Sequence, residues 1–366
     1  MLAGLDFDIS VSEKGLLVEL DGYSSQMLEL LKDLAPRLQK ASIDEQRFLI
    51  LKNDLIRELK NQKYKKAYEQ LLYEMANIVS LNAVHYKTYY NPKENIDLIS
   101  PLTLNEVMSF GEKLWEKVGR EGLAYGSIKE SSVKEAVEFF YTSMSSKSLA
   151  KKDHPKQEIY ELTKPLPVAY LHKADNPNYC WGKYLQVGQR TPELDAMLRI
   201  SHALFEADFF NQLRTEQQLG YIVHSGLRYY ENYLGFLFLI QSSSHNPFDV
   251  NDRVKKWSTK LIDSLASLTD KEFDVYKQAV ISKLNEPDKT IGDYHSTLYF
   301  EAVIMKGVFD YKNKVAQAAS KITKENVHLF IEQNLKNTAQ NSLTVFLTKE
   351  SLMFFCRQGN KLLAHC

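Results

Sequence analysis

An arginine and a tyrosine, seven residues apart, are the best candidates for chemistry in this sequence. They lie in the segment FNQLRTEQQLGYIV at 210–223, which predicts the end of an amphipathic helix, a polar turn and a strand. Such a corner places Arg214 and Tyr221 at a rim that a ligand can reach. Both could donate hydrogen bonds to a carbonyl or a developing oxyanion, and loss of one such donor typically costs about 3–4 kcal/mol. The alternative is structural: Arg214 pairs with Glu216 or a helix C-terminus, and Tyr221 packs in the sheet.

Histidines are the other residues that could do chemistry, and nine are present. A catalytic zinc site usually takes three protein ligands, often including two histidines one helical turn apart. The sequence contains no H-E-x-x-H or H-x-x-E-H, and its nearest pattern is His202 with Glu206 on an apolar helix. Two ligands do not make such a site, so we favour a half-buried or partner-facing His202. His224 could line a cleft, but a satisfied strand histidine fits better.

Composition and charge argue against several other classes of protein. Lys plus Arg and Asp plus Glu both number 46, so the net charge is zero, whereas nucleic-acid binders usually carry a basic excess. Cys180, Cys356 and Cys366 are too few for a disulfide framework, and free thiols fit a reducing compartment. No apolar segment approaches the roughly 18 residues of a membrane span, and no leader pattern is present. These features predict a cytoplasmic protein without nucleic-acid or membrane partners.

Hydrophobic periodicity predicts a mixed α+β protein. The predicted strands are 5–10, 15–21, 122–125, 168–172, 179–187, 220–225, 234–242 and 342–347. The predicted helices are 26–38, 46–76, 103–117, 131–141, 192–213, 249–265, 269–284, 291–305 and 323–334. Prolines at 92 and 101 are expected to bracket a loop.

The order of predicted elements repeats, which indicates two tandem homologous αβ domains. A hairpin and two helices follow residues 2–5, and the same order follows residues 218–221. The second copy is preceded by two strands and a helix that the first lacks. We therefore expect a first domain at 1–145 without its N-terminal strands and helix, a linker at 146–167, a second domain at 168–348 and a tail at 349–366. Either a longer chain was cut or a partner completes the first domain, and we favour the cut.

Several motifs resemble the C-terminal half of the insulin-degrading enzyme and pitrilysin family of zinc peptidases. The most specific is LRTEQQLGYIV at 213–223; FLIQS at 238–242 and LAGL at 2–5 support it, and the similarity extends in order to about residue 347. The resemblance implies domains with a metallopeptidase, LuxS-like sandwich fold, a mixed sheet covered by helices. It further implies two halves that close around a peptide, with the zinc held by the N-terminal half. Residues 349–366 match no known pattern.

By this resemblance, Arg214 and Tyr221 correspond to residues that reach the active site from the non-zinc half. They would hydrogen-bond the substrate backbone and help to stabilise the tetrahedral intermediate. We therefore expect no metal site in this chain, no activity of the chain by itself, and a peptide substrate bound together with an N-terminal catalytic half in cis or in trans. A homo-oligomer is also compatible with the sequence.

Two other hypotheses stay open at this stage. The chain could be a non-catalytic subunit or degenerate relative that holds peptides or pairs with a separate zinc-bearing half, which the absence of a metal motif supports. The less favoured one is a free-standing enzyme of another class that uses His202 and Glu206. Neither the identity of the peptide nor the role of the tail follows from the sequence.

Overall fold

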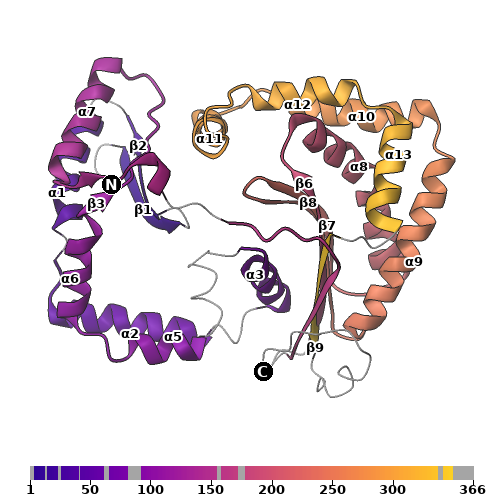
Figure 1. Cartoon of the computed structure of the whole chain (residues 1–366), viewed down its shortest axis with the longest axis horizontal. Helices are drawn as coiled ribbons and strands as arrows, with labels where there is room; N and C mark the ends of the chain where they lie inside the picture. The colour runs from indigo at the N-terminus through magenta and orange to yellow at the C-terminus, as the bar shows by residue number, and fades with distance from the viewer. Residues whose placement is uncertain are drawn as a thin grey trace. The chain divides into compact units, whose positions relative to one another are not determined.

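The computed structural model describes residues 4–12, 15–23, 26–40, 42–61, 66–80, 92–154, 158–171, 178–336 and 341–348 (Figure 1). The tail predicted at 349–366 lies outside these residues. The described chain divides into two compact units, and the division does not follow a single cut in the sequence. Residues 66–80 belong to unit 2, and residues 288–307 belong to unit 1.

Unit 1 contains two small sheets and a set of helices. Strands β1 (Leu5–Ser12) and β2 (Gly15–Gly22) form an antiparallel pair in which Leu5 lies opposite Gly22. The two-residue strands β3 (Lys117–Val118) and β4 (Lys147–Ser148) pair in parallel. The helices of unit 1 are α1 (Met27–Gln39), α2 (Glu45–Asn61), α5 (Pro92–Ile99), α6 (Leu104–Leu114), α7 (Glu130–Ser143), the 3-10 turn η3 (Lys151–Asp153), α11 (Ile291–Tyr299) and the π-helical turn η5 (Phe300–Ile304).

Unit 2 is built on a five-stranded mixed sheet in the order β5-β9-β6-β8-β7. Strands β5 and β9 are parallel, and the other neighbouring pairs are antiparallel. Strand β7 is therefore an edge strand, and β8 and β6 lie inside the sheet. The bounds are β5 (Leu166–Leu171), β6 (Tyr179–Gln189), β7 (Ile222–Tyr230), β8 (Tyr233–Ser242) and β9 (Ser342–Thr348).

Helices cover both faces of this sheet, as Figure 1 shows. Helix α3 (Ala67–Val79) packs on one face, where Gly182 leaves room for Leu71 and Met75. The opposite face is covered by α8 (Pro192–Phe210) and α9 (Pro247–Ala266). The remaining elements of unit 2 are α10 (Asp270–Leu284), α12 (Tyr311–Ser320), α13 (Lys324–Ile331) and two π-helical turns, η4 (Asn211–Glu216) and η6 (Glu332–Lys336).

An aromatic cluster forms the core between the sheet and helices α8 and α9. Phe205 and Phe209 from α8 meet Phe236 and Phe238 from β8 and Trp257 from α9, with ring centroids 4.9–6.4 Å apart. All five side chains are at most 3% exposed. Burial of rings of this size dominates the energetics of a core, so α8 is held firmly against the sheet up to its last turn.

The predicted α+β class is confirmed, and so is the repeated order of a hairpin followed by two helices. The hairpin β1–β2 precedes α1 and α2, and the hairpin β7–β8 precedes α9 and α10. The assignment of 1–145 and 168–348 as the two family domains stays a prediction.

One long helix predicted over 46–76 is wrong. Helix α2 ends at Asn61, and Lys66, at the start of α3, has the extended angles φ −61° and ψ 146°. No Gly or Pro lies at this break, so the local sequence does not indicate it. The helix is interrupted because the two segments bury their apolar stripes in different units. Six residues of α3 are buried against unit 2, whereas α2 buries Phe48 and Leu59 in unit 1.

Three smaller predictions also fail. The strand expected at 122–125 is irregular, and the short parallel pair β3–β4 forms instead. The loop expected between the prolines at 92 and 101 is helix α5, in which Pro92 stands at the first position, where a missing N–H costs nothing. Helix α12 was not predicted, because its stripe of small residues, Val315, Ala316, Ala318 and Ala319, gives a weak periodic signal.

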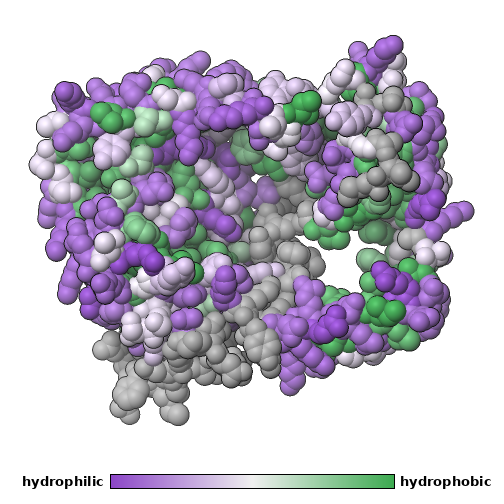
Figure 2. Space-filling view, turned by 180° about the vertical axis from the view of Figure 1, so that it is seen from behind, coloured by the Kyte–Doolittle hydropathy of each residue, from purple (hydrophilic) through white to green (hydrophobic). Residues whose placement is uncertain are grey.

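The surface is mixed rather than uniformly polar. Figure 2 shows one face on which hydrophilic residues dominate, with smaller hydrophobic areas between them. No helix among the described residues is long and apolar enough to span a membrane.

Candidate functional site

Arg214 and Tyr221 lie at the corner between α8 and β7, as the helix–turn–strand order predicted. Helix α8 does not simply stop, because its last turn widens into the π-helical turn η4, which ends at Glu216. The amide N–H of Leu219 then donates to the carbonyl oxygen of Leu213, 2.9 Å away, and closes the turn. Single π-helical turns are rare and often occur at functional sites.

Buried residues hold this corner against the rest of unit 2. Leu213 and Leu219 are fully buried, and the residues between them are exposed or half-buried. Gly220 is required by packing, because a Cβ there would lie only 2.0 Å from the backbone oxygen of Gln241 on β8. Gln218 adopts the left-handed conformation with φ +52°, which costs a non-glycine residue about 1–2 kcal/mol. The corner therefore holds its outward-facing side chains on a rigid base.

The guanidinium of Arg214 is oriented by the strand that follows it. Its Nη1 donates to the backbone oxygens of Gly220, at 2.8 Å, and of Tyr221. The guanidinium carbon lies 4.9 Å from the centroid of the Tyr221 ring and 5.8 Å from that of Phe210. These are cation–π distances, worth about 0.5–1 kcal/mol at an exposed site. The guanidinium and the phenol ring are thus held next to each other.

Tyr221 faces outward, which contradicts the structural alternative for this residue, whereas Arg214 is half-buried. Tyr221 is 83% exposed, and Phe210 beside it is 44% exposed. Glu216 accepts a hydrogen bond from Gln212 rather than from Arg214. Within the described residues, both hydrogen bonds of Arg214 start from Nη1. A guanidinium has five N–H donors, so the Nη2 and Nε donors and the Tyr221 hydroxyl can reach a bound molecule.

His202 and Glu206 occupy a different setting from this corner. His202 is half-buried, with Nδ1 3.7 Å from a Glu206 carboxylate oxygen and Nε2 3.3 Å from the Ser225 hydroxyl on β7. Burial lowers the pKa of the His202 imidazole, and Glu206 only partly opposes this shift. His202 also meets the edge of the Phe205 ring at 5.3 Å. The geometry is that of a histidine satisfied within its own unit, whereas His224 is exposed on the edge strand.

Comparisons with known proteins match both parts of the chain. The family model for the middle or third domain of peptidase M16 matches residues 1–91. The model for domain 4 of the C-terminal lobe of PQQ synthase PqqF-like proteins matches residues 200–298. Insulin-degrading enzyme of Drosophila melanogaster is 26% identical over 331 residues, which cover 88% of this chain and 32% of that protein.

Solved structures agree with these matches at the level of the fold. Pitrilysin superposes with a TM-score of 0.80 at 18% identity, over 99% of this chain and 37% of that one. An inactive domain of peptidase M16 from Pseudomonas fluorescens superposes with a TM-score of 0.66 at 15% identity, over 95% of this chain and 81% of that one. The chain corresponds to the C-terminal half of insulinase-family proteins.

This insulinase-family chain spans about a third of the length of the curated relatives that it matches. The family is one of zinc metallopeptidases. Among the described residues, no group of three or more His, Cys, Asp or Glu side chains is placed to hold a metal ion. No third ligand for His202 and Glu206 is present in the part of the chain that the structure describes. The described part of the chain therefore offers no set of ligands that fits a catalytic zinc ion.

Two features of unit 2 escaped prediction. Phe210 contacts the Arg214 guanidinium, and its spacing of four residues before Arg214 on a helix was an available signal. Lys183 interrupts an apolar strand, and it lies buried beside a small cavity. A lone lysine in a buried strand was a signal as well, but its partners come from distant elements.

Proposed function

We propose that this chain is the non-zinc half of a peptide-degrading enzyme and that it closes over the substrate. Arg214 and Tyr221 bind the peptide backbone near the scissile carbonyl and stabilise the tetrahedral intermediate. The observation that carries the proposal is the half-buried Arg214 guanidinium held beside the exposed Tyr221 phenol on a rigid corner. The resemblance to insulin-degrading enzyme supports it.

The geometry suits a site that receives negative charge. Arg214 keeps a fixed plane because Gly220 and Tyr221 accept from its Nη1. A fixed donor costs no reorganisation when the carbonyl oxygen becomes an oxyanion, and this preorganisation is the source of most of the rate gain at such sites. The Tyr221 hydroxyl supplies a second, neutral donor from the same side. Arg214 and Tyr221 thus hold the reacting carbonyl, while groups on the other half attack its carbon.

Substitution in the assembled enzyme tests these roles, with the zinc-bearing half in cis or in trans. Tyr221→Phe removes only the hydroxyl, and we expect kcat for a short peptide to fall about 10²–10³-fold, the usual effect of losing an oxyanion donor. Arg214→Lys keeps the charge but loses the planar fork, so it should restore only part of the activity lost in Arg214→Ala.

Matched controls come from the same unit. Tyr276→Phe alters a tyrosine on α10 that is 38% exposed, and Arg253→Ala removes an arginine paired with Asp249 on α9. Both controls should keep the activity of the parent enzyme. Unchanged kcat/KM in both Tyr221→Phe and Arg214→Ala would reject the assigned roles.

A second candidate function is a peptide-binding partner subunit without a catalytic role of its own. The likeness to an inactive M16 domain over 81% of that chain favours it. In this case the chain would form a stable complex with a separate zinc-bearing protein, and peptide affinity would fall in Tyr221→Phe while the turnover of bound peptide stayed constant. Single-turnover kinetics with saturating enzyme separate the two functions.

A further inference from the structure

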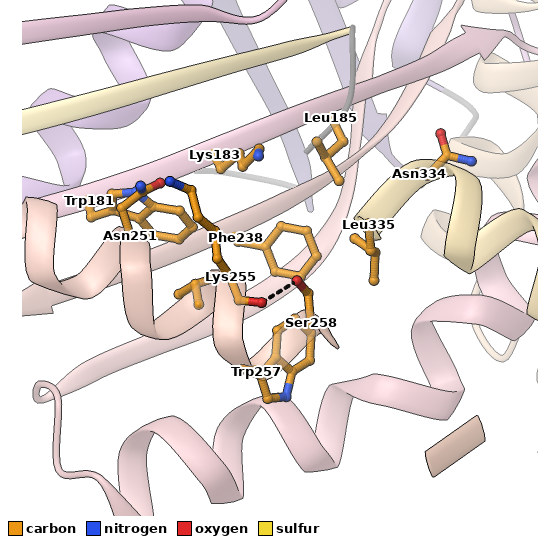
Figure 3. A pocket seen from close by; sticks show the side chains of 11 residues that line it. Trp181, Lys183, Leu185, Phe238, Asn251, Lys255, Trp257, Ser258, Asn334 and Leu335 are labelled. Atoms are coloured by element: carbon orange, nitrogen blue, oxygen red, sulfur yellow. Dashed lines mark hydrogen bonds between the residues drawn. The ribbon is translucent and has the colours of Figure 1, made fainter. Parts of the chain in front are cut away.

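The two faces of strand β6 are covered in different ways. Trp181 and Lys183 on one face line a small cavity beside α9, which Figure 3 shows. Its volume of about 20 Å³ holds little more than one water molecule. Gly182, between them in sequence, points the opposite way, toward Leu71 and Met75 of α3. The residues on the α3 face of the sheet can therefore be followed from Gly182 outward.

Helix α3 covers only part of this face. Gly182 lies opposite Leu239 on β8, and Leu239 lies opposite His224 on β7. Residues directly opposite each other share a face of the sheet, and every second residue of a strand returns to it. His224, Gly226 and Arg228 thus lie on the α3 side of β7. Helix α3 packs over β6, β9 and β8, and along β7 His224 is exposed and Arg228 is half-buried.

The guanidinium of Arg228 has no acceptor among the described residues. Its carbon lies 5.0 Å from the centroid of the Tyr230 ring, and its Nε is buried without a hydrogen-bond partner. The described residues supply neither an acceptor nor an ion-pair partner to its Nη groups. Each of the other arginines described in unit 2 donates to an oxygen: Arg190, Arg199, Arg214 and Arg253. A buried donor without an acceptor is costly, so Arg228 needs an explanation.

A second donor lies next to Arg228. Tyr184 on β6 is fully buried, and the end of its ring lies over Gly235, the residue directly opposite Arg228 on β8. The Tyr184 hydroxyl makes no hydrogen bond of normal geometry within the described chain. Gln186 lies close by, but its amide bonds to the backbone elsewhere. Burial raises the pKa of the Tyr184 hydroxyl, and the Arg228 charge opposes this rise.

Gly226 leaves room between Arg228 and a third polar group. A Cβ on Gly226 would lie 3.0 Å from Nε2 of His224, so the imidazole leans along the strand toward Arg228. The described residues add no carboxylate to this position. What it lacks is an acceptor with negative charge, and a carboxylate matches the planar fork of an arginine.

We propose that Arg228, together with His224, binds a carboxylate of the peptide that the Arg214 corner holds. The inference rests on the proposed function of Arg214 and Tyr221. Strand β7 begins at Ile222, and a rise of about 3.3 Å per residue places Arg228 roughly 20 Å further along it. An extended peptide that lies along β7 has the same rise. Its carboxylate therefore belongs to a residue about six positions from the scissile bond, as a side chain or as the chain terminus.

Peptide pairs that differ in one carboxylate test the site in the assembled enzyme, with the zinc-bearing half in cis or in trans. Two pairs of fluorogenic peptides carry Glu or Gln about six residues from a single cleavable bond, on one side or on the other. A third pair ends at this distance in a free carboxylate or an amide. We expect about tenfold higher kcat/KM for the charged member of one pair, mainly through KM, because hydrogen bonds to charged groups are strong.

The pair that shows the preference tells whether a side chain or the terminus binds. Equal cleavage within all three pairs overturns the proposal, and this result needs no variant.

Substitutions of Arg228 then assign the preference to this residue. Arg228→Gln removes the charge, and the preference should fall below about twofold. Arg228→Lys keeps the charge without the planar fork, so an intermediate preference is expected. Arg253→Gln is the matched control, since Arg253 is paired with Asp249 on α9, and it should keep the parental preference. The full parental preference in Arg228→Gln overturns the proposal.

Tyr221→Phe separates this inference from the function on which it rests. It should lower kcat equally for both members of a pair and leave their ratio unchanged. A preference that depends on Arg228 while Tyr221→Phe has normal kcat would reject the role of the corner and retain the carboxylate site. A loss of kcat in Tyr221→Phe without any preference in the parent would retain the corner and overturn the carboxylate site.

Discussion

The two hairpins of this chain start in the same way and differ in what they carry. Gly4 precedes β1, and Gly220 precedes β7 by two residues. A Cβ on Gly4 would lie 2.6 Å from the ring of Tyr23, the residue after β2. A Cβ on Gly220 would lie 2.0 Å from the backbone oxygen of Gln241 on β8. The next residue is Leu5 in the first hairpin and the exposed Tyr221 in the second. A glycine at this position is thus common to both hairpins, whereas a tyrosine after it is present only in the second.

Their surroundings differ even more. Strand β8 is buried along almost its whole length inside a five-stranded sheet, whereas β2 has no fully buried residue. In β1, Phe7 is 50% exposed and Val11 is 74% exposed. A rigid core covered on both faces therefore lies beneath the Arg214 corner, whereas the first hairpin has no such core among the described residues.

Phenylalanine truncation should separate the two hairpins most clearly. Phe236 on β8 is fully buried and its ring meets Phe205 at 5.3 Å, so Phe236→Ala should lower the free energy of unfolding by about 3–5 kcal/mol. Phe7→Ala in β1 should cost less than about 1 kcal/mol, since half of that side chain is already in water. Urea unfolding followed by tryptophan fluorescence measures both. Equal losses would mean that β1 is as well packed as β8.

Lys183→Met should stabilise the chain near neutral pH, because it removes a buried charge. The folded-state pKa of about 8 lies below the ordinary lysine pKa of 10.5, so between these values the unfolded chain binds more protons and stability rises with pH. Below pH 8 the buried charge costs on the order of 3 kcal/mol. The variant should therefore exceed the parent by up to this amount at pH 7, and the gap should close between about pH 8 and 10.5.

Urea unfolding of parent and variant across this pH range gives the difference directly. Glu19→Gln in β2 is the control, because Glu19 is exposed on the first hairpin and its neutralisation should change stability by less than about 0.5 kcal/mol. A gap between parent and Lys183→Met that does not vary with pH would show that the effect is one of packing rather than of charge.

The helices and strands around the Arg214 corner could be predicted from the sequence, but their packing could not. The period of 3.6 residues in α8 and the alternation in β7 predicted the corner, because both patterns are local. The π-helical turn at Asn211–Glu216 and the left-handed Gln218 depend on the burial of Leu213 and Leu219 and on the backbone of β8, and β8 comes from a later part of the chain. The cavity at Lys183 depends likewise on α9 and η6. The break between α2 and α3 arises because the two helices are buried in different units. No residue at the break indicates this in the sequence.

The glycines at the two hairpin starts should respond unequally to alanine. Gly220→Ala places a Cβ against fixed backbone of β8, and we expect a loss of about 1–3 kcal/mol, typical of overpacking. Gly4→Ala meets the ring of Tyr23, which is 82% exposed and can move, so the cost should be near 1 kcal/mol, mainly from its φ of +65°. Chemical denaturation of the two variants ranks them. The reverse order would show that the β1 corner is the more rigid one.

Tyr221→Phe should give the smallest change in stability of all. The ring is 83% exposed and keeps its contact with the Arg214 guanidinium at 4.9 Å, so the free energy of unfolding should stay within about 0.5 kcal/mol of the parent. Tyr230→Phe on the same strand is the buried counterpart, since Tyr230 is 4% exposed and packs edge-on against Tyr184 at 5.0 Å. A large loss in Tyr221→Phe would assign the hydroxyl a structural role. A loss of turnover without a loss of stability is what the second hairpin should show if its exposed phenol serves the substrate rather than the fold.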